Sequence, residues 1–305
     1  MKRKKYKWKK YIPFYVMAIP GIIYFFINNY MPMFGLAIAF KKLNFRVGIL
    51  KSPWCGLENF EFLFRSKDAW TITRNTILYN LAFIILGTIM GIALAIFLNE
   101  IRCKVVSSFY QSVLLIPYLM SWVIVGYLAY AFLSSDTGFL NNTILPLLGK
   151  EEISWYTEKK FWPLILIFVS EWKGLGFTMV IYLSSIIGIS KEYYEAARID
   201  GAGKWNQIRY ITLPMLKSTV ITMTLLNIGR IFYSDFGLFY QVPRNSGMLY
   251  DVTRTIDVYV YNALMKNPDY GLASAASFYQ SIVGLILILL ANWLVRRVDK
   301  DNALF

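Results

Sequence analysis

Four charged residues lie inside long apolar stretches of this 305-residue chain. Glu171 and Lys173 belong to the segment SEWKGLGF, and Arg230 and Asp235 belong to NIGRIFYSDFG. A charged side chain in a membrane-like setting costs about 2.5 to 3.5 kcal/mol to insert, so such residues usually serve a function. The chemistry that they predict is the binding of a polar solute by charge and hydrogen bonds. The alternative is that they form ion pairs between helices, since residues two or five apart do not face each other on one helix.

Catalytic chemistry has few residues to depend on. The chain has no histidine, which excludes a Ser-His-Asp triad and imidazole metal ligands. The two cysteines, Cys55 and Cys103, make no disulfide framework. The stretch Gly-Ala-Gly-Lys that begins at Gly201 is followed by Trp205, so it lacks the hydroxyl residue of a phosphate-binding loop. The sequence therefore predicts no catalytic residue, no metal site and no cofactor bound by this chain.

The composition is that of a membrane protein. Hydrophobic residues make up 57% of the chain and charged residues 16%, against about 45 to 50% and about 25% in soluble domains. A bilayer core needs about 20 mainly apolar residues in a helix. Six stretches meet that length, at 11–40, 75–98, 107–133, 161–189, 218–242 and 271–295. The predicted fold class is all-α, with six transmembrane helices. The first is predicted to be tilted or kinked near its outer end, because it is long and contains Pro20 and Pro32.

The chain has a net charge of +14, and the positions of its basic residues predict its orientation in the membrane. Seven of the first ten residues are basic, and basic residues near spans stay in the cytoplasm. Residues 1–10 are thus predicted to be a cytoplasmic N-terminus, 41–74 an extracytoplasmic loop and 75–305 a core of five helices. With six spans the C-terminus is cytoplasmic too. The basic charge is then explained by topology and the lipid bilayer, not by nucleic acid.

The longest cytoplasmic loop, 191–216, reads KEYYEAARIDGAGKWNQIRYITLPML. Residues 191–199 favour a helix, the glycines of Gly-Ala-Gly end it, and 204–210 form a second amphipathic stretch. Pro214 is predicted to mark the entry to the fifth span. Such a helix-turn-helix can dock on another protein, whereas the alternative is an amphipathic helix that lies on the membrane.

This loop resembles the complete EAA loop of ABC-importer permeases. The signature positions are Glu195, Ala196, Ala197, Asp200, Gly201, Ala202, Ile211, Leu213 and Pro214. In that family the loop is the coupling helix that docks into a groove on the ATP-hydrolysing subunit. Small residues permit close approach, and the two acids can cap helix ends or pair with the partner.

Segments that begin at Tyr30, Ser52 and Gly237 resemble the polysaccharide and oligosaccharide branch of these permeases, in the half similar to maltose permeases. The resemblance implies the type I ABC-importer permease fold in a bacterial cytoplasmic membrane. It also implies a second permease subunit, two ATP-binding subunits that hold ATP and Mg, and an extracytoplasmic solute-binding lipoprotein. The expected function is alternating-access import of an oligosaccharide. An ion-gradient-driven secondary transporter is the alternative, although the two halves show no internal repeat.

The resemblance also suggests where substrate binds, in the spans that flank the EAA loop. Matching positions, counted from Glu195, combine with neighbouring aromatic and charged residues. Sugar hydroxyls need such donors and acceptors, and sugar rings stack on aromatic faces. The predicted substrate-binding residues are Glu171, Trp172, Lys173, Asn227, Arg230, Tyr233, Ser234 and Asp235.

Overall fold

The computed structural model describes residues 8–61, 65–266 and 268–298, and almost all of its regular structure is helical. Within these residues five helices are long and apolar enough to cross a membrane, and a sixth span is a bent pair of helices. The prediction of an all-α membrane protein is therefore confirmed. The single helices are Tyr11–Phe40, Lys67–Glu100, Lys159–Ile187, Lys204–Ile228 and Tyr270–Arg297.

The chain divides into two compact units. The first comprises residues 1–65 and 262–279, and the second comprises residues 66–261 and 280–305. In the first unit, the predicted first span consists of α1 (Trp8–Phe25), the π-helical turn η1 (Phe26–Tyr30) and the 3-10 helix η2 (Met31–Phe40). Its side chains from residue 11 to residue 34 are all exposed. Pro32 lies at the start of η2, where the irregular winding continues, and the predicted kink stays a prediction.

A small aromatic cluster forms the core of the first unit. Phe40, Phe60 and Phe278 pack edge to face around the buried Ala39 and Ala275. The short elements α2 (Gly48–Lys51) and η3 (Glu58–Phe60) lie in the loop that follows the first span. Helix α14 (Ile256–Lys266) ends in this unit, and helix α15 (Tyr270–Val298) begins in it.

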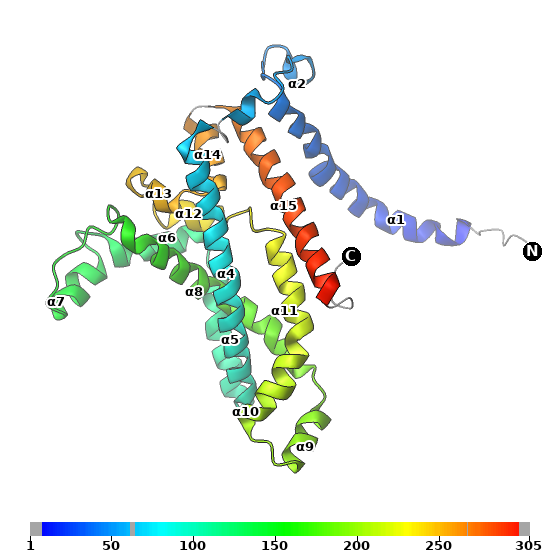
Figure 1. The fold of residues 1–305 in the computed structure, drawn as a ribbon, viewed down its shortest axis with the longest axis vertical. Coiled ribbons are helices and arrows are strands. Elements are labelled where there is room, and N and C mark those ends of the chain that lie inside the picture. Colours follow the sequence, from blue (N-terminus) through cyan, green and yellow to red (C-terminus); the bar gives the residue numbers. More distant parts are fainter. Residues whose placement is uncertain (1–7, 62–64, 267, 299–305) are drawn as a thin grey trace, which may run out of the picture. The chain divides into compact units, whose positions relative to one another are not determined.

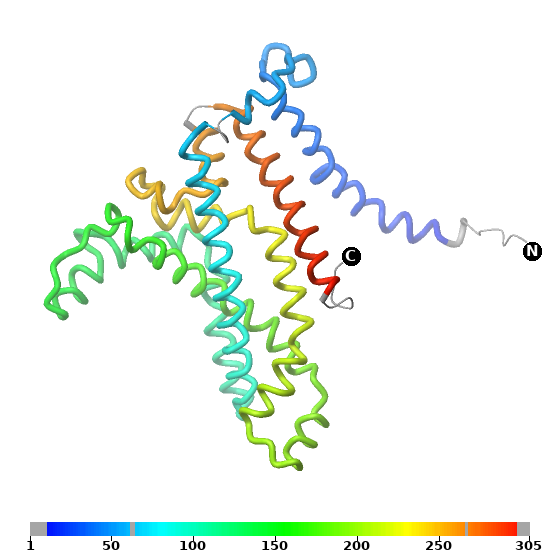
Figure 2. Tube along the Cα trace, in the orientation of Figure 1, coloured from blue at the N-terminus to red at the C-terminus, as the bar shows by residue number. Residues whose placement is uncertain are grey.

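The second unit contains the remaining helices and is shown in Figures 1 and 2. Helix α4 (Lys67–Glu100) packs along α8 (Trp162–Ile187), which also packs against α5 (Lys104–Leu119). Helix α4 begins at Lys67 rather than at residue 75, because the Ser66 hydroxyl accepts a hydrogen bond from the Ala69 amide and caps it. Helices α9 (Lys191–Ile199) and α10 (Lys204–Gln207) lie at one end of α4 and α11 (Leu213–Ile228).

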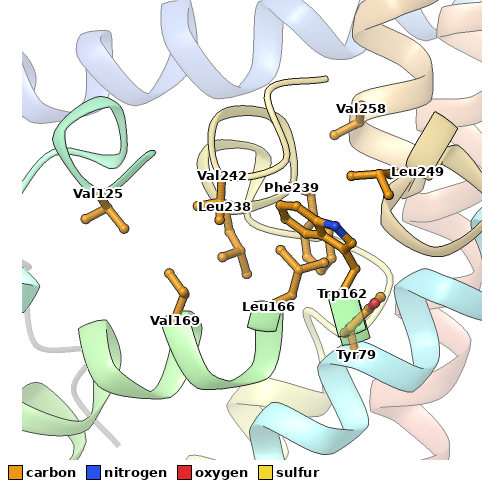
Figure 3. Close-up of a cluster of buried hydrophobic side chains, with 10 residues drawn as sticks. All are labelled: Tyr79, Val125, Trp162, Leu166, Val169, Leu238, Phe239, Val242, Leu249 and Val258. Carbon is orange, nitrogen blue, oxygen red and sulfur yellow. The ribbon is translucent and has the colours of Figure 1, made fainter. Parts of the chain in front are cut away.

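The core of this unit surrounds Trp162. Figure 3 shows its indole among Tyr79, Leu166 and Phe239, and Trp162 is completely buried. The indole nitrogen donates to the Trp155 carbonyl at 2.7 Å, so its one polar atom is satisfied. The cluster joins α4 and α8 to α12 (Phe236–Gln241) and thereby fixes the walls of the site described below.

The third predicted span, 107–133, is present as a bent pair of helices. Helices α5 and α6 (Trp122–Leu133) meet at an angle of 95°. Pro117 lies in the last turn of α5 and has no N–H to continue the helix. Ser121 then caps α6 by accepting a hydrogen bond from the Ile124 amide. The break is therefore built from residues that stop one helix and start another.

The bounds of the fifth predicted span, 218–242, are wrong. The helix runs without interruption from Lys204 through the π-helical turn η6 (Ile208–Thr212) into α11, and it ends at Ile228. Pro214 follows the π-helical turn directly and lies ten residues into this continuous helix. The entry predicted at Pro214 is thus inside a longer helix, and α12 is a separate element.

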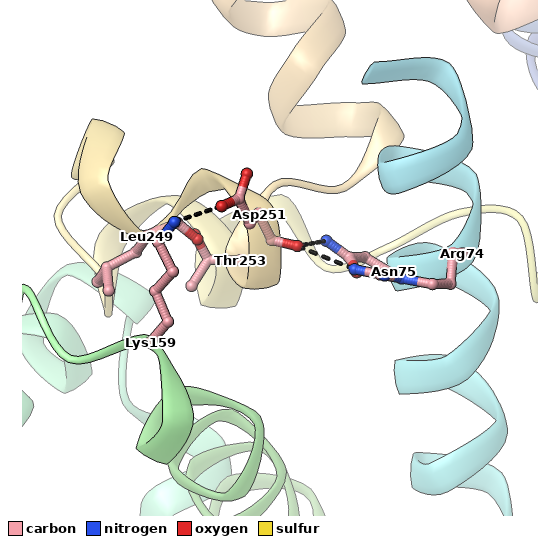
Figure 4. A network of polar contacts seen from close by, with 6 residues as sticks. All are labelled: Arg74, Asn75, Lys159, Leu249, Asp251 and Thr253. Atoms are coloured by element: carbon pink, nitrogen blue, oxygen red, sulfur yellow. Dashed lines mark hydrogen bonds and ion pairs between the residues drawn. The ribbon is translucent and has the colours of Figure 1, made fainter. Parts of the chain in front are cut away.

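A polar network ties the loop after α12 to the rest of the second unit (Figure 4). Arg74 and Asn75 of α4 each donate to the Asp251 carbonyl at 3.1 Å, and Asn75 also donates to the Arg254 carbonyl. Lys159 forms an ion pair with Asp251. The hydrogen bond from Lys159 holds the pKa of the Asp251 carboxyl below its usual range. The second unit also contains the short elements η4 (Leu140–Ile144), α7 (Leu145–Leu147), η5 (Lys159–Phe161), η7 (Gly247–Leu249) and α13 (Tyr250–Thr253).

Candidate functional site

A cavity of about 430 Å³ opens where α11 ends and α12 has not yet begun. Its lining comes from the middle of α4 and from the segment between α11 and α12, and consists of Asn80, Phe83, Ile84, Asn227, Arg230, Tyr233, Ser234 and Asp235. Five of the eight residues predicted to bind substrate are thus brought together. The other three, Glu171, Trp172 and Lys173, do not line this cavity.

The segment between the two helices is irregular for local reasons. Gly229 ends α11, and Asp235 begins α12 by accepting hydrogen bonds from the Gly237 and Leu238 amides at 2.9 and 3.3 Å. Arg230 and Asp235 were predicted to lie within a helical span. The structure corrects this, since both belong to the non-helical connection, where backbone groups and side chains can face a solute.

Asn80 organises this connection, and sequence reasoning missed it. Its amide nitrogen lies 2.9 to 3.1 Å from the carbonyl oxygens of Thr76, Ile231 and Tyr233. It therefore holds two carbonyls of the irregular segment against α4. The signal was present, because an asparagine in the middle of a predicted span is costly unless it has a task.

Ser234 is held on the opposite side by Asp257, a second residue that sequence reasoning missed. The Ser234 amide and hydroxyl each lie 2.7 Å from the same Asp257 carboxylate oxygen. Gln280 donates to that oxygen at 3.3 Å and to the Phe232 carbonyl at 2.8 Å. The cavity wall is therefore supported from α4, α14 and α15 within the second unit.

Arg230 is the free charge of the cavity. Its side chain is exposed, and within the described part of the chain it forms no ion pair. Asp235 is engaged elsewhere, because its second carboxylate oxygen accepts a hydrogen bond from the Trp122 indole at 2.8 Å. The alternative of an ion pair between Arg230 and Asp235 is thus not realised among the described residues, and the guanidinium is left to face a solute.

Lys173 lies at the break between α5 and α6. Its ammonium donates to the Tyr118 carbonyl at 2.8 Å and lies over the rings of Tyr118 and Trp122, 5.4 and 5.0 Å from their centroids. A cation at this place satisfies a carbonyl at the C-terminal end of α5 and interacts favourably with the helix dipole. The geometry assigns Lys173 to the bend, and its contact with substrate stays a prediction.

Glu171 and Trp172 face other surroundings. Glu171 is buried, and its carboxylate lies against Gly87 of α4, so close that a Cβ added to this glycine would lie 3.3 Å from it. No ion pair between Glu171 and Lys173 occurs in the part of the chain that the structure describes. Trp172 lines a separate, almost wholly apolar cavity of about 660 Å³ between α6 and α8. Their roles in binding substrate stay predictions.

We expect Asn80→Asp to impair substrate binding. The change keeps the size of the side chain but replaces an amide donor by an acceptor that faces the carbonyls of Thr76, Ile231 and Tyr233. Leaving these carbonyls without their donor costs about 1 to 3 kcal/mol, so the KM for uptake should rise about tenfold. Asn142→Asp is the control, since Asn142 also donates to two carbonyls but lies in η4 and does not line the cavity. An unchanged KM for Asn80→Asp would contradict this role.

The loop predicted to couple to a partner forms a compact pair of short helices. Helix α9 is capped by Ser190, and Gly201, with φ of +79°, turns the chain at its C-terminus. The Asp200 amide then donates to the Ala196 carbonyl at 3.0 Å and the Ala202 amide to the Ala197 carbonyl at 2.8 Å. The signature residues Glu195, Ala196, Asp200, Gly201, Leu213 and Pro214 are exposed, whereas Ala197, Ala202 and Ile211 are half-buried.

The inner face of this loop is held by polar contacts, whereas its outer face is exposed. On the inner face, Lys204 pairs with Glu100 of α4 at 2.5 Å, and the Tyr194 and Thr212 hydroxyls lie 2.9 Å apart. On the outer face, Ile199 is 87% exposed and Trp205 is 70% exposed. A loop that is anchored inside and presents large apolar side chains outside is typical of a surface that another protein covers.

These features define a class of protein, a multi-pass helical permease with a docking loop at one end and a polar cavity among its helices. Residues 83–300 match the family described as the binding-protein-dependent transport system inner membrane component. The chain belongs to this family, and it is a multi-pass protein of the cytoplasmic membrane. The prediction of an ABC-importer permease is confirmed.

Individual relatives are similar in sequence to this chain along nearly its full length. The polygalacturonan/rhamnogalacturonan transport system permease protein YteP of Bacillus subtilis (strain 168) is 34% identical over 96% of this chain and 90% of its own. Protein LplB of the same organism is 32% identical over 98% of this chain and 92% of its own. Neither gives support to the alternative of a secondary transporter.

A solved structure shares the fold. It is the crystal structure of a bacterial ABC transporter involved in the import of the acidic polysaccharide alginate. One of its chains superimposes with a TM-score of 0.87 and 31% identity, over 95% of this chain and 97% of that one. A related crystal structure of the alginate transporter contains a periplasmic protein with a bound alginate pentasaccharide, and it matches with a TM-score of 0.86.

Proposed function

We propose that this permease imports acidic oligosaccharides and that Arg230 binds a carboxylate of the substrate in the cavity between α11 and α12. The observation that carries the proposal is the exposed guanidinium, unpaired among the described residues, in a cavity with Tyr233, Asn227 and Phe83. Arginine binds carboxylates through two parallel hydrogen bonds, and aromatic rings and amides suit the remainder of a sugar. The transport of an acidic polysaccharide by the structural relative supports the same class of substrate.

The partners in this proposal are those of a complete importer. A second permease subunit supplies the other half of the pathway, and an extracytoplasmic solute-binding lipoprotein delivers the oligosaccharide. Two ATP-binding subunits hold ATP and Mg, because this chain has no phosphate-binding loop in its sequence. They dock on the EAA loop at Ile199 and Trp205, on the cytoplasmic side together with both termini.

The continuous helix Lys204–Ile228 connects the docking loop to the cavity. Its 25 residues span about 37 Å at 1.5 Å per residue. One end carries Trp205 on the docking surface, and the other end carries Asn227 in the cavity wall. Movement of the ATP-binding subunits can therefore change the cavity through a single stiff element, which suits alternating access.

The test is replacement of Arg230 in the assembled complex. We expect Arg230→Gln to reduce uptake of a uronate oligosaccharide at least about tenfold, because a charge-assisted hydrogen bond contributes about 1.5 to 3 kcal/mol. Arg230→Lys should retain part of the uptake, since lysine keeps the charge but not the paired donors. ATP hydrolysis measured without substrate should not change. Unchanged uptake by Arg230→Gln would contradict the proposal.

A further inference from the structure

A second, smaller cavity lies at the other end of α12. It has a volume of about 240 Å³, and α6 and α12 form its walls together with the turn after α12. Its polar and aromatic lining consists of Tyr127, Tyr130, Tyr240, Gln241, Arg244 and Asn245. Three tyrosines, one guanidinium and two amide side chains around a space of this size are the groups that bind a single sugar ring.

Arg244 is the charged group of this cavity. Its side chain is exposed, and its guanidinium lies 4.1 Å from the centroid of the Tyr130 ring. It forms no ion pair with any residue that the structure describes. Stacking on Tyr130 fixes the plane of the guanidinium and leaves its edge, which carries the donors, available for a carboxylate.

The backbone at this place is held in an uncommon conformation. Arg244 and Asn245 have φ values of 54° and 47°, the only positive φ angles of residues other than glycine in the described chain. An arginine in this region is strained, and such strain persists where the surrounding structure over-determines it, most often at functional sites. Here the Arg244 and Asn245 amides donate to the carbonyls of Gln241 and Tyr240 at 3.2 and 3.0 Å. These bonds turn the Arg244 side chain back over α6.

Two glycines allow the close crossing that shapes the cavity. A Cβ at Gly126 of α6 would lie 3.0 Å from the Gln241 carbonyl oxygen, and one at Gly237 of α12 would lie 2.1 Å from the Trp122 ring. The Trp122 indole in turn binds Asp235, which lines the first cavity. Helices α6 and α12 therefore form the walls of the second cavity, and α6 is linked to the first cavity through this hydrogen bond.

We propose that the second cavity is a further subsite for an acidic sugar unit, with Arg244 bound to its carboxylate and Tyr127 stacked on its ring. Helix α12 lies between the two cavities, and its six residues span about 9 Å, which is comparable with the distance between the first and the third unit of an oligosaccharide. A chain of three or more units reaches both arginines, whereas a disaccharide reaches only one. This inference rests on the proposed function and adds a length requirement to it.

The experiment compares uronate oligosaccharides of two to five units in the complete importer. For each length, uptake is measured with the wild type, Arg244→Gln, Arg230→Gln and Arg297→Gln. Arg297 is a matched control, because it also stacks on an aromatic ring, Trp293, at 3.9 Å but lines neither cavity. Arg244→Lys and Tyr127→Ala are added to separate charge from stacking, and ATP hydrolysis without substrate reports on assembly.

We expect Arg244→Gln to weaken uptake of tri- to pentasaccharides about tenfold and to leave the disaccharide unchanged, with partial rescue by Arg244→Lys. Arg230→Gln should weaken every length, and Arg297→Gln none. If Arg244→Gln affects no length while Arg230→Gln affects all, the second subsite is wrong and the proposed function stands. If Arg244→Gln lowers all lengths equally together with basal ATP hydrolysis, Arg244 is structural and the subsite is wrong. If the wild type takes up no uronate oligosaccharide, the proposed function itself fails.

Discussion

Gly176→Ala should prevent this protein from accumulating in a folded form. A Cβ at Gly176 of α8 would lie 2.0 Å from the carbonyl oxygen of Leu114 and 3.0 Å from the Cα of Leu115 in α5. Both contacts are with backbone, so no side-chain rotation relieves them. Overpacking a tight interface costs about 1 to 3 kcal/mol and occasionally more, and we expect the upper end of this range because α5 and α8 would have to separate.

The neighbouring glycine supplies the control. Gly174 lies two residues earlier on the same helix, and a Cβ added there would have no neighbouring atom within 4 Å. Gly174→Ala should therefore leave stability unchanged or raise it by up to about 1 kcal/mol, through helix propensity. Detergent-soluble monodisperse protein and its midpoint of thermal unfolding measure both variants. Equal yield and equal midpoint for the two alanines would contradict the packing argument.

The second large effect is expected for Gly201→Val, which should impair coupling to the ATP-binding subunits rather than folding. The φ of +79° at Gly201 is accessible to glycine and strained for a β-branched residue. Because a Cβ at this position would meet nothing within 4 Å, Gly201→Val changes the backbone preference without a steric clash. The turn between α9 and α10 would then shift, and the exposed Ile199 and Trp205 would no longer form one surface. We expect uptake to fall about tenfold or more, since the strain costs about 1 to 2 kcal/mol.

Two variants isolate the backbone effect. Gly201→Asn should keep most of the uptake, because asparagine enters the left-handed region more readily than other residues. Gly203 also has open space where a Cβ would lie, but its φ is −67°, so Gly203→Val should be tolerated. Co-purification of the ATP-binding subunit and ATP hydrolysis by the complex are measured beside uptake. Loss of uptake in Gly203→Val but not in Gly201→Val would contradict the explanation.

The docking loop could be predicted from sequence because its signals are local. Glu195, Asp200 and Gly201 act within a few residues of their positions, and a turn glycine ends a helix whatever surrounds it. The five apolar helices could be predicted for the same reason, since length and hydropathy alone decide them. The cytoplasmic orientation of the termini stays a prediction.

The breaks in the spans depend on contacts from distant parts of the chain. Pro117 and Ser121 are local signals for the bend between α5 and α6, but Lys173 and Asp235 hold Tyr118 and Trp122 in place from α8 and from the start of α12. Hydropathy cannot show such contacts, because it treats the bent pair as one apolar stretch. For this reason sequence reasoning did not foresee the contacts of Lys173 at the bend and missed Asn80.

The π-helical turn Ile208–Thr212 has a consequence for how such permeases can change through evolution. A π-turn contains one residue more than the α-helical turn that it replaces, and each residue rotates a helix by about 100°. The extra residue is accommodated within this one turn, so Trp205 at the docking surface and Asn227 in the cavity keep nearly the rotational phase that an α-helix one residue shorter would give them. A one-residue deletion here can convert the turn to α-helix and keep both sites in phase, whereas a deletion elsewhere in Lys204–Ile228 would rotate one site away from the other by about 100°. Single-residue deletions in this helix should thus be tolerated at the π-helical turn and be far rarer on either side of it.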